Sequence, residues 1–196
     1  GAVVKCDGSA CGPVVSTITT NRLRSVVASK SGEVWTVGDG GTVLKCDASG
    51  SSCASIPSGT SSDLYSVWVS SDGQAWAVGD RGTILQCQGG ACNPLASGRT
   101  DLLVGIFGSG SGEVMAHGSG GTLLRCTGTG CTPVRTGTSS LLNKAWIGPS
   151  GDVWAVGNNG DIVRCGADAC ALMSSGAQIS LNSLAGDGVG TIWAVG

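Results

Sequence analysis

The chain has 196 residues, a length that suits one domain or a small array of repeats. Only 12% of the residues are charged, 35 are glycine and no long helical period is present, so the composition predicts an all-β protein with many turns. The formal net charge of -2 gives no electrostatic reason to bind nucleic acid. No apolar run approaches the length of a membrane-spanning helix, so membrane insertion is not expected.

One unit recurs along the chain and is clearest at residues 73–87, GQAWAVGDRGTILQC. Its two halves are rich in β-branched and apolar residues and the GDRG between them supplies turn glycines, so it predicts a β-hairpin. The first half returns at 34–38, 114–118, 153–157 and 192–196. The cysteine pairs that follow the hairpin begin at residues 6, 46, 87, 126 and 165, a period of 39 to 41 residues. Such a period, with four strand signals in each copy, is typical of a β-propeller blade.

Each copy has the same chain order and begins with an inner strand that starts at a leucine. These inner strands are expected at 23–27, 64–68, 103–107, 142–146 and 181–185. A polar turn, the W-A-V-G strand, the T-I-L-x-C strand and a weaker outer strand follow, and linkers rich in Ser, Gly and Thr lead to the next copy. The repeat units are therefore expected at about 16–55, 56–96, 97–135, 136–174, and 175–196 together with 1–15.

The two ends of the sequence carry complementary halves of one unit. Residues 1–6 match the third strand of a copy, and residues 192–196 match the second. Joined, they would make a fifth complete blade and leave no unpaired sheet edge. We therefore expect a single domain over 1–196, an all-β, five-bladed β-propeller whose ring is closed by a blade shared between the N- and C-termini. The competing interpretation is a segment of a longer propeller, cut at the same phase.

The ten cysteines form five local pairs, each bracketing a short segment rich in Gly, Ala and Ser. Such a loop would bring its two cysteines opposite each other, close enough for a disulfide. Zinc ligation is the alternative, but it needs two pairs to converge on one ion, and the chain has one His. Disulfides are therefore predicted, and they imply a secreted, periplasmic or cell-surface protein. The predicted bridges are Cys6–Cys11, Cys46–Cys53, Cys87–Cys92, Cys126–Cys131 and Cys165–Cys170.

The pattern L-x-S-V-x(7-8)-W-A-V-G-x-x-G-T-I-L is best seen from Leu64 to Leu85, and all five copies share it. It resembles the neuraminidase-repeat-like propellers related to photosystem II assembly factors. Family members usually continue into a D-G-G-x-T-W segment, where this chain has a cysteine pair, and the assembly factors have more blades. A role in photosystem assembly is therefore not expected. Five blades are also found in tachylectin-type lectins, an analogy of architecture alone.

The residues predict no catalytic site. Sialidases, which the resemblance brings into consideration, use an arginine triad and a tyrosine nucleophile with an acidic partner. The inner strands offer Arg24 and one tyrosine, Tyr65, with no acidic residue in a matching position. The other arginines of the repeats fall in a turn or beside the cysteines. Because no paired carboxylates, triad or metal cluster can be placed, we expect no enzymatic activity, no cofactor and no metal.

Two bulky positions recur in the repeats. Trp35, Trp76, Trp154 and Trp193 share the first, with Met115 in the remaining copy. Tryptophans could stack sugars, but Met is a core filler and a poor sugar platform, so packing between blades is favoured. Trp68, Phe107 and Trp146 share the second position, with Val27 and Ala185 in the other copies. Packing between blades is favoured there too, with grooves in some blades only as the alternative.

The most variable register lies where each inner strand begins. It holds Arg24, Tyr65, Val104, Asn143 and Asn182, followed by Ser25, Ser66, Gly105, Lys144 and Ser183. Their apolar neighbours change little between copies, and propellers bind at channel mouths, so this divergence points to a ligand surface. Solvated strand ends without a role are the alternative. The predicted ligand-binding residues are Arg24, Tyr65, Asn143, Lys144 and Asn182, together with Trp68 and Trp146.

The remaining polar candidates are interpreted as structural. His117 replaces a valine in one copy, and no other His or acidic cluster accompanies it. Asp39, Asp80, Ser119 and Asn158 begin the G-x-x-G turns, where they are expected to adopt positive φ and to cap their own turns. Calcium would need several oxygen ligands that converge on one ion, and a phosphate would need a helix after the glycines.

The sequence thus predicts a non-catalytic extracellular binding module, with a lectin-like, carbohydrate-binding role favoured. Five similar loop faces could present several weak sites, and avidity would raise their combined affinity. The alternative is a protein–protein interaction or assembly scaffold. The expected ligand is therefore a glycan or a protein, and the chain is expected to be monomeric.

Overall fold

The computed structural model describes residues 1–15, 19–109, 112–167, 169–187 and 189–196. Within these ranges the chain forms antiparallel β-sheets joined by turns and three short 3-10 segments. No helix in the described part of the chain is long and apolar enough to cross a membrane. The predicted all-β class is confirmed.

Four sheets have four strands each, and we call them blades I to IV. Blade I consists of β3 (Leu23–Ala28), β4 (Val34–Gly38), β5 (Val43–Cys46) and β6 (Cys53–Ser55). Blade II consists of β7 (Leu64–Val69), β8 (Ala75–Gly79), β9 (Ile84–Gln88) and β10 (Ala91–Leu95). Blade III consists of β11 (Leu103–Gly108), β12 (Val114–Gly118), β13 (Leu123–Thr127) and β14 (Gly130–Pro133). Blade IV consists of β15 (Leu142–Ile147), β16 (Val153–Gly157), β17 (Asp161–Cys165) and β18 (Cys170–Ser174).

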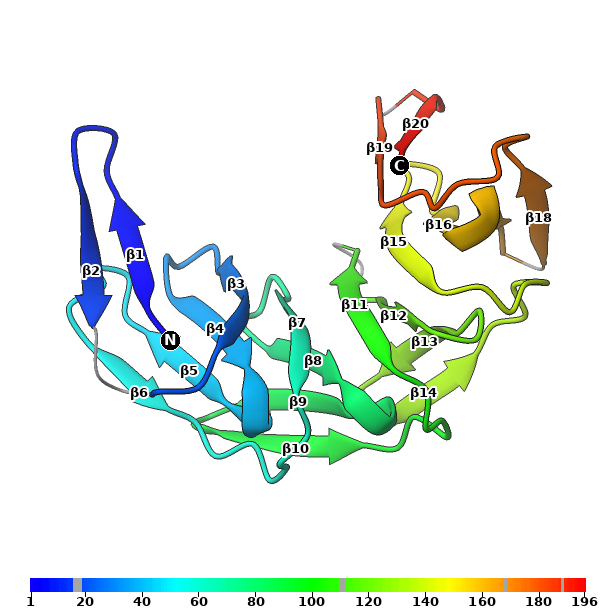
Figure 1. Ribbon diagram of the computed structural model, residues 1–196. Helices are drawn as coiled ribbons and strands as arrows, with labels where there is room; N and C mark the ends of the chain where they lie inside the picture. Colours follow the sequence, from blue (N-terminus) through cyan, green and yellow to red (C-terminus); the bar gives the residue numbers. More distant parts are fainter. Residues whose placement is uncertain (16–18, 110–111, 168, 188) are drawn as a thin grey trace.

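Two further sheets have two strands each. The N-terminal half-blade is β1 (Val3–Cys6) with β2 (Cys11–Val15), and the C-terminal half-blade is β19 (Ser183–Gly186) with β20 (Ile192–Val195). Figure 1 shows the sheets following one another along an arc, with the first strand of each complete blade on the inner side and the fourth on the outer side. Each blade is a meander, because its strands pair in chain order.

The predicted closure of the ring is not confirmed. Among the described residues β1 pairs only with β2, and β20 pairs only with β19. Figure 1 places the two termini on opposite arms of an open arc. The complementary strand patterns indicate which strands could pair. Whether those strands meet depends on the angle between neighbouring blades, which side-chain packing at the interfaces determines, and in this structure they do not meet.

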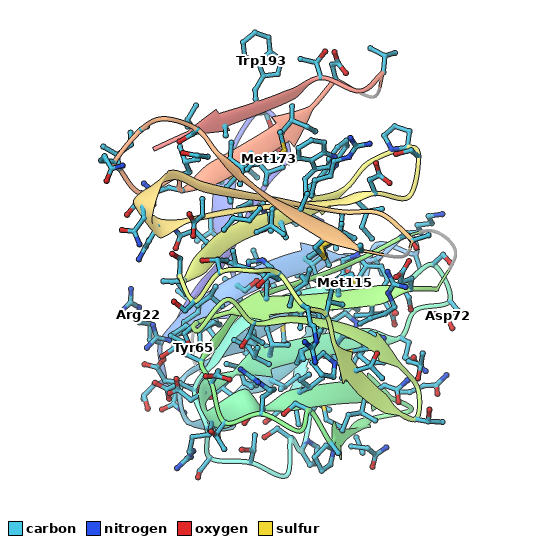
Figure 2. The ribbon with its side chains drawn as sticks, turned by 90° about the vertical axis from the view of Figure 1, so that its right-hand side faces the viewer. Arg22, Tyr65, Asp72, Met115, Met173 and Trp193 are labelled. Carbon is cyan, nitrogen blue, oxygen red and sulfur yellow. A yellow bond between two sulfur atoms is a disulfide. The ribbon has the colours of Figure 1, made fainter. Side chains whose placement is uncertain are left out.

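The hydrophobic core lies between adjacent blades. Trp35 of blade I packs with Leu64 and Val67 of blade II, and Trp76 of blade II packs with Ile106 of blade III. Met115 of blade III joins the cluster that holds Leu142 and Ala145 of blade IV. These three bulky side chains are 0 to 3% exposed, which confirms the prediction that this repeat position packs between blades. Trp193 differs: it is 70% exposed and projects away from the fold in Figure 2.

At the second bulky repeat position, which holds Trp68, Phe107 and Trp146, the size of the side chain is matched by the size of the residue that faces it on the next blade. A Cβ on Gly108 would lie 2.4 Å from the Trp68 ring, and a Cβ on Gly186 would lie 2.3 Å from the Trp146 ring. Each large indole is thus opposite a glycine of the next blade. Where this position holds a residue smaller than tryptophan, the next blade has a residue larger than glycine. Val27 and Val69 pack against one cluster, and Phe107 and Ile147 pack against another. The variation among copies therefore reflects paired packing between neighbours.

Three of the four G-x-x-G turns in blades I to IV are 3-10 segments: η1 (Asp39–Gly41), η2 (Asp80–Gly82) and η3 (Asn158–Gly160). The expectation that the first turn residue takes positive φ is wrong. The next residue does so, as at Arg81 (φ 56°) and Asn159 (φ 61°), because the left-handed bend falls in the middle of the segment. The glycine before the turn is needed for space, since a Cβ on Gly79 would lie 2.0 Å from the carbonyl oxygen of Asp63.

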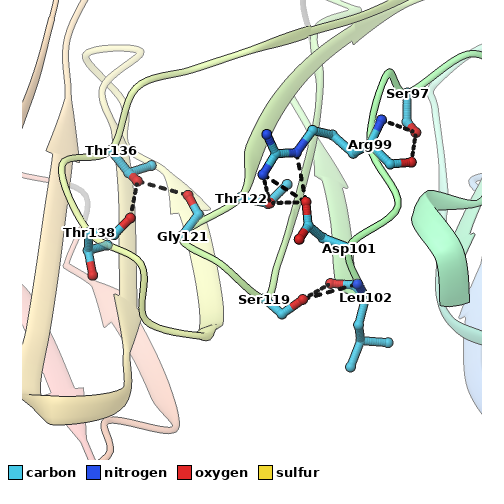
Figure 3. Close-up of polar contacts among 9 residues, drawn as sticks. All are labelled: Ser97, Arg99, Asp101, Leu102, Ser119, Gly121, Thr122, Thr136 and Thr138. Atoms are coloured by element: carbon cyan, nitrogen blue, oxygen red, sulfur yellow. Dashed lines mark hydrogen bonds and ion pairs between the residues drawn. The ribbon is translucent and has the colours of Figure 1, made fainter.

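The linkers between blades, expected to be rich in Ser, Gly and Thr, contain a recurring Ser/Thr-Gly-x segment whose hydroxyl forms hydrogen bonds with the backbone. The buried hydroxyl of Ser97 donates to the carbonyl of Arg99 and accepts its N–H, both at 3.1 Å (Figure 3). Thr136 donates at 2.8 Å to the carbonyl of Gly121, in the turn of blade III. The Ser97 bonds shape the linker itself, and the Thr136 bond holds its linker against the blade that precedes it.

The five predicted disulfides are confirmed: Cys6–Cys11, Cys46–Cys53, Cys87–Cys92, Cys126–Cys131 and Cys165–Cys170. In each pair the cysteines are register partners on adjacent antiparallel strands, with Cα atoms 3.9 to 4.1 Å apart. Four bridges therefore link the third and fourth strands of blades I to IV, the fifth links the two strands of the N-terminal half-blade, and none links two sheets. The zinc alternative is excluded because no free cysteine remains.

Candidate functional site

The beginnings of β3 and β7 bring Arg24 and Tyr65 together across the interface of blades I and II. The Arg24 guanidinium lies 4.7 Å from the centroid of the Tyr65 ring. It forms an ion pair with Asp39 and lies 3.4 Å from a carboxylate oxygen of Asp63. Asp63 also accepts the N–H of Gly40 at 2.8 Å. With Asp80 beside Tyr65, these side chains form what we call the mouth cluster: Arg24, Asp39, Asp63, Tyr65 and Asp80.

The mouth cluster lies on one face of the arc. In Figure 2, Tyr65 and Arg22, near the starts of inner strands, lie on one side, and Asp72, in a hairpin turn, lies on the opposite side. The cluster is half-buried: the Arg24 side chain is 22% exposed and that of Asp63 34%. Solvent and a ligand can therefore reach it, although its members already contact one another.

The electrostatics of the cluster keep Arg24 charged and Tyr65 neutral. The hydrogen bond with Asp39 raises the pKa of Arg24 above its ordinary value. Burial is the largest cause that raises the pKa of Tyr65, and the charge of Asp80 and a hydrogen bond to it add to the effect. A phenol whose ionisation is disfavoured acts as a hydrogen-bond donor and not as a nucleophile. Three carboxylates against one guanidinium leave the cluster negatively charged.

The expectation that Tyr65 has no acidic partner is wrong, because Asp80 of the same blade is its partner. The sequence signal was present in the repeats. Inner-strand residue and turn residue vary together, as Arg24 with Asp39, Tyr65 with Asp80, and Asn143 with Asn158. Each pair meets in space, since the inner strand starts beside the turn that ends the second strand. The expected capping of their own turns by Asp39 and Asp80 does not account for these contacts.

Asn143 forms side-chain hydrogen bonds that link blade IV to the next repeat. Its amide donates to Asn158 at 3.1 Å and to the backbone carbonyl of Leu181, in the next repeat, at 2.9 Å. Asn182 occupies the matching register of the C-terminal half-blade and is exposed. The structure thus brings Arg24 and Tyr65 together. Figure 1 places β15, which holds Asn143, and β19, which begins just after Asn182, on the other arm of the arc.

Lys144 is exposed, and its positive charge acts on His117, which is buried. Burial lowers the pKa of His117 to about 4, despite a hydrogen bond between its Nδ1 and the carbonyl oxygen of Leu142 at 3.0 Å, and Lys144 lowers it further. The ring fits because position 105 is glycine: a Cβ there would lie 2.1 Å from Nε2. His117 is therefore a neutral core residue that links blades III and IV, and it is closed to solvent.

Trp68 and Trp146 lie three positions along the inner strands from Tyr65 and Asn143, roughly 10 Å away at the usual strand rise. They pack over the glycines described above. Trp146 also lines a groove with Phe107 and Pro149 between blades III and IV, together with Lys144. The predicted ligand residues therefore divide between the mouth and this second region, and do not form one site. No group of metal-ligating side chains occurs in the described ranges.

No protein-family model matches the sequence, and no curated protein does. Solved structures are similar. A catalytically inactive histidine-to-alanine variant of virginiamycin B lyase from Staphylococcus aureus with quinupristin aligns at a TM-score of 0.83 and 14% identity, over 99% of this chain and 70% of that chain. YCF48 bound to D1 peptide aligns at 0.70 and 22% identity, over 95% and 65%. The WD40 β-propeller domain of Doa1 aligns at 0.74 and 16% identity, over 89% and 62%.

These likenesses, with the succession of four-stranded meanders around an arc, define a β-propeller fold. At sequence identities of 14 to 22%, these likenesses show a shared fold and do not show a shared activity. The chain spans 62 to 70% of the length of the structures that it matches. The resemblance to propellers of the kind related to photosystem II assembly factors is thus supported at the level of the fold.

Proposed function

We propose that the chain is a non-catalytic binding module whose mouth cluster recognises a segment of another protein. The observation that carries this proposal is the Arg24–Tyr65 pair, set among Asp39, Asp63 and Asp80 on an accessible face. A protein ligand offers the cationic side chains and backbone carbonyls that three carboxylates, a guanidinium and a phenol donor would bind. YCF48, a propeller with a bound peptide, supports this class of ligand.

A carbohydrate ligand, which the sequence favoured, is the second candidate. The hydrogen-bonding groups of the mouth cluster suit hydroxyl groups, but one face of Tyr65 is covered by Arg24. Trp35 and Trp76 are buried, and Trp68 and Trp146 are half-buried, each packed against a glycine of the next blade. Packing between blades therefore takes up much of the aromatic surface that a sugar would need, and none of these four rings belongs to the mouth cluster. We place the protein ligand first for this reason.

An enzymatic role is disfavoured by the chemistry of the side chains. The lyase neighbour is inactive when a histidine becomes alanine. The single histidine here, His117, is buried, and its low pKa keeps it neutral above about pH 4. Tyr65 is held as a neutral phenol. These observations support a module that binds without turnover, and the five intrablade disulfides support a secreted, periplasmic or cell-surface location.

The test is a titration with labelled short peptides, one lysine-rich, one glutamate-rich and one neutral, followed by fluorescence anisotropy. We expect the lysine-rich peptide to bind and its affinity to fall as salt is raised, because the cluster is negatively charged. Asp63→Asn and Tyr65→Ala should each weaken binding about tenfold or more. Asn182→Ala is the matched control, since Asn182 has the same register and is exposed.

Three outcomes would contradict the proposal: equal binding of all three peptides, no binding, or binding that the Tyr65→Ala and Asp63→Asn variants retain. Simple sugars at millimolar concentration form a parallel arm. A saturable response to one of them that Tyr65→Ala abolishes would establish the carbohydrate alternative. The domain limits and the five-blade count predicted from sequence remain predictions.

A further inference from the structure

The outer strand of blade IV differs from the other outer strands in one repeat position, the second residue after its cysteine. Three copies have proline there: Pro13, Pro94 and Pro133. In blade I, β6 ends at this position with Ser55, and Pro57 follows two residues later. Blade IV instead has Leu172, in the middle of β18, and this leucine is 46% exposed.

The backbone nitrogen at this position faces away from the blade. In blade II the N–H of Cys92 donates at 3.0 Å to the carbonyl of Pro57, in the linker before the blade. In blade III the N–H of Cys131 donates in the same way to Ala96, at 3.4 Å. Two residues further along an antiparallel edge strand the nitrogen has the same direction, and a proline there carries no N–H. The prolines therefore protect the outer edges of these blades against pairing with a further strand.

In blade IV the outward donors are present. Gly166 donates to the carbonyl of Ala169 at 3.0 Å, which closes the hairpin and leaves the N–H groups of Cys170 and Leu172 facing outward. Within the part of the chain that the structure describes, neither of these two N–H groups has a backbone acceptor beyond the blade. An edge strand with free outward donors and acceptors is a template for the addition of another strand.

A pocket of about 470 Å³ lies beside this edge, between the outer parts of blades III and IV. Ala169 and Cys170 of blade IV line it together with Arg125 and Arg135. Arg125 is paired with Glu113 at 2.7 Å. Arg135, in the linker after β14, is exposed and forms no ion pair with any carboxylate among the described residues. The edge of β18 therefore has an uncompensated positive charge near Cys170.

We propose that an extended, acidic segment of a partner protein adds to β18 as a further strand of blade IV. The backbone of the segment pairs with Cys170 and Leu172, and a carboxylate of the segment binds Arg135. The acidic residues lie at the Cys170 end, because Asp161 is the register partner of Ser174 at the other end of β18. A side chain of the added strand covers the exposed side chain of Leu172.

This site is separate from the mouth cluster in position and in charge. β18 lies on the outer side of the arc, whereas β3 and β7, where Arg24 and Tyr65 are found, lie on the inner side (Figure 1). The mouth cluster is negatively charged and selects cationic groups, and the β18 edge selects carboxylates. The two sites therefore bind different segments.

The charge also favours a partner protein over a second copy of this chain. Two β18 strands paired with each other would bring an Arg135 from each copy toward one shared edge. Like charges on neighbouring strands are destabilising, whereas an acidic segment neutralises the guanidinium that it meets.

The experiment uses labelled short peptides of alternating threonine and valine, with two glutamates near one end, and measures binding by fluorescence anisotropy. We expect the glutamate peptide to bind, and the same peptide with lysines in place of the glutamates to bind about tenfold more weakly or less. Two further copies of the glutamate peptide carry N-methyl groups on alternate nitrogens, one copy for each set. One copy should lose binding and the other should keep it, because only every second N–H group of an added strand faces β18.

Leu172→Pro is the decisive variant. It should abolish binding and still fold, as circular dichroism will verify, because blades II and III accommodate proline at this position. Leu172→Ala is the matched control: it keeps the N–H group and should weaken binding far less. Arg135→Gln should remove the preference for glutamate over lysine. Tyr65→Ala should leave the affinity unchanged, since it alters the mouth cluster alone.

Four results would overturn the proposal: no binding of the glutamate peptide, equal binding of the glutamate and lysine peptides, binding that Leu172→Pro retains, or binding that both N-methylated copies retain. Loss of binding in Tyr65→Ala would place the acidic peptide at the mouth cluster and would also overturn it. Light scattering gives the remaining outcome. A mass of twice 19.2 kDa that Leu172→Pro returns to 19.2 kDa would show that a second copy covers β18 in place of an acidic partner.

Discussion

At the scale of single residues, the clearest result is that one copy departs from the repeat in two positions at once. His117 stands where blades I, II and IV have valine, and Gly105 stands where blades I and II have serine. Ser25 and Ser66 accept the N–H groups of Val67 and Ile106 in the next blade, at 3.2 and 3.3 Å. Blade III lacks this hydroxyl, and the His117 imidazole supplies a link to Leu142 of blade IV in its place. The two changes compensate for each other.

This buried imidazole predicts a specific loss of stability in mild acid. The pKa of His117 is about 4 in the folded protein and near its ordinary 6.5 in the unfolded chain. Between these values the unfolded chain binds the proton and the folded chain does not, so the free energy of unfolding falls as pH decreases from about 6.5 to about 4. The loss amounts to about 3 kcal/mol once the pH is below the lower value. Urea unfolding at several pH values measures it.

The control for this experiment is the double variant Gly105→Ser with His117→Val, which restores the pair found in blades I and II. It should lose the pH dependence in this interval. The single variant Gly105→Ser should be strongly destabilised, because its Cβ would meet the imidazole. A double variant that keeps the acid-induced loss would assign the effect to another group.

At the scale of elements, the interfaces between blades are paired in volume. Trp68 on β7 is accommodated because β11 ends in Gly108, and Trp146 on β15 is accommodated by Gly186 on β19. Between blades I and II, Val27 and Val69 pack against the same apolar cluster. The blades are therefore not interchangeable, because the residue at the end of each inner strand has the size that fits the residue facing it on the neighbouring blade.

We predict that Gly108→Val destabilises the fold by several kcal/mol, because the new side chain would overlap the indole of Trp68 and would overpack the interface. Adding Trp68→Val should recover a large part of the loss, since it copies the Val27–Val69 pair. The coupling energy of this double-mutant cycle should lie at about 1 to 3 kcal/mol and is measured by chemical denaturation. Additive effects of the two substitutions would show that the residues do not share one space.

At the scale of the whole molecule, the disulfides reinforce blades and not the arc. All five close short loops between adjacent strands of one sheet, which are the third and fourth strands in blades I to IV. The arc itself depends on apolar contacts between blades, on the linker hydrogen bonds and on the mouth cluster, where Asp63 of blade II holds the turn of blade I. Stability is therefore expected to be a sum over blades and over interfaces, as in other repeat proteins.

Removal of one bridge, Cys87→Ala with Cys92→Ala, should lower the free energy of unfolding by about 2 kcal/mol, the loop-closure value for so short a ring. Cys165→Ala with Cys170→Ala should cost a similar amount. These pairs lie in separate clusters of the core, so the combined variant should show the sum of the two losses. A combined loss well above the sum, measured by urea unfolding, would contradict the independence of the blades.

The sequence by itself determined the strands, the meander order, the disulfides and the position of the bulky core residues. These features repeat, and each depends on residues close together in the chain: alternation, turn glycines and the spacing of each cysteine pair. It also indicated Arg24 and Tyr65, through their divergence from the other copies.

Only the tertiary structure decided how the copies meet. The Trp68–Gly108 match, the meeting of Arg24 with Asp63, and the imidazole of His117 above Gly105 join residues that repeat rules treat separately. The open arc belongs with them, because closure depends on a small angle at each interface, summed over all blades. Strand complementarity between residues 1–6 and 192–196 identifies strands that could pair, but the packing between blades determines whether they meet.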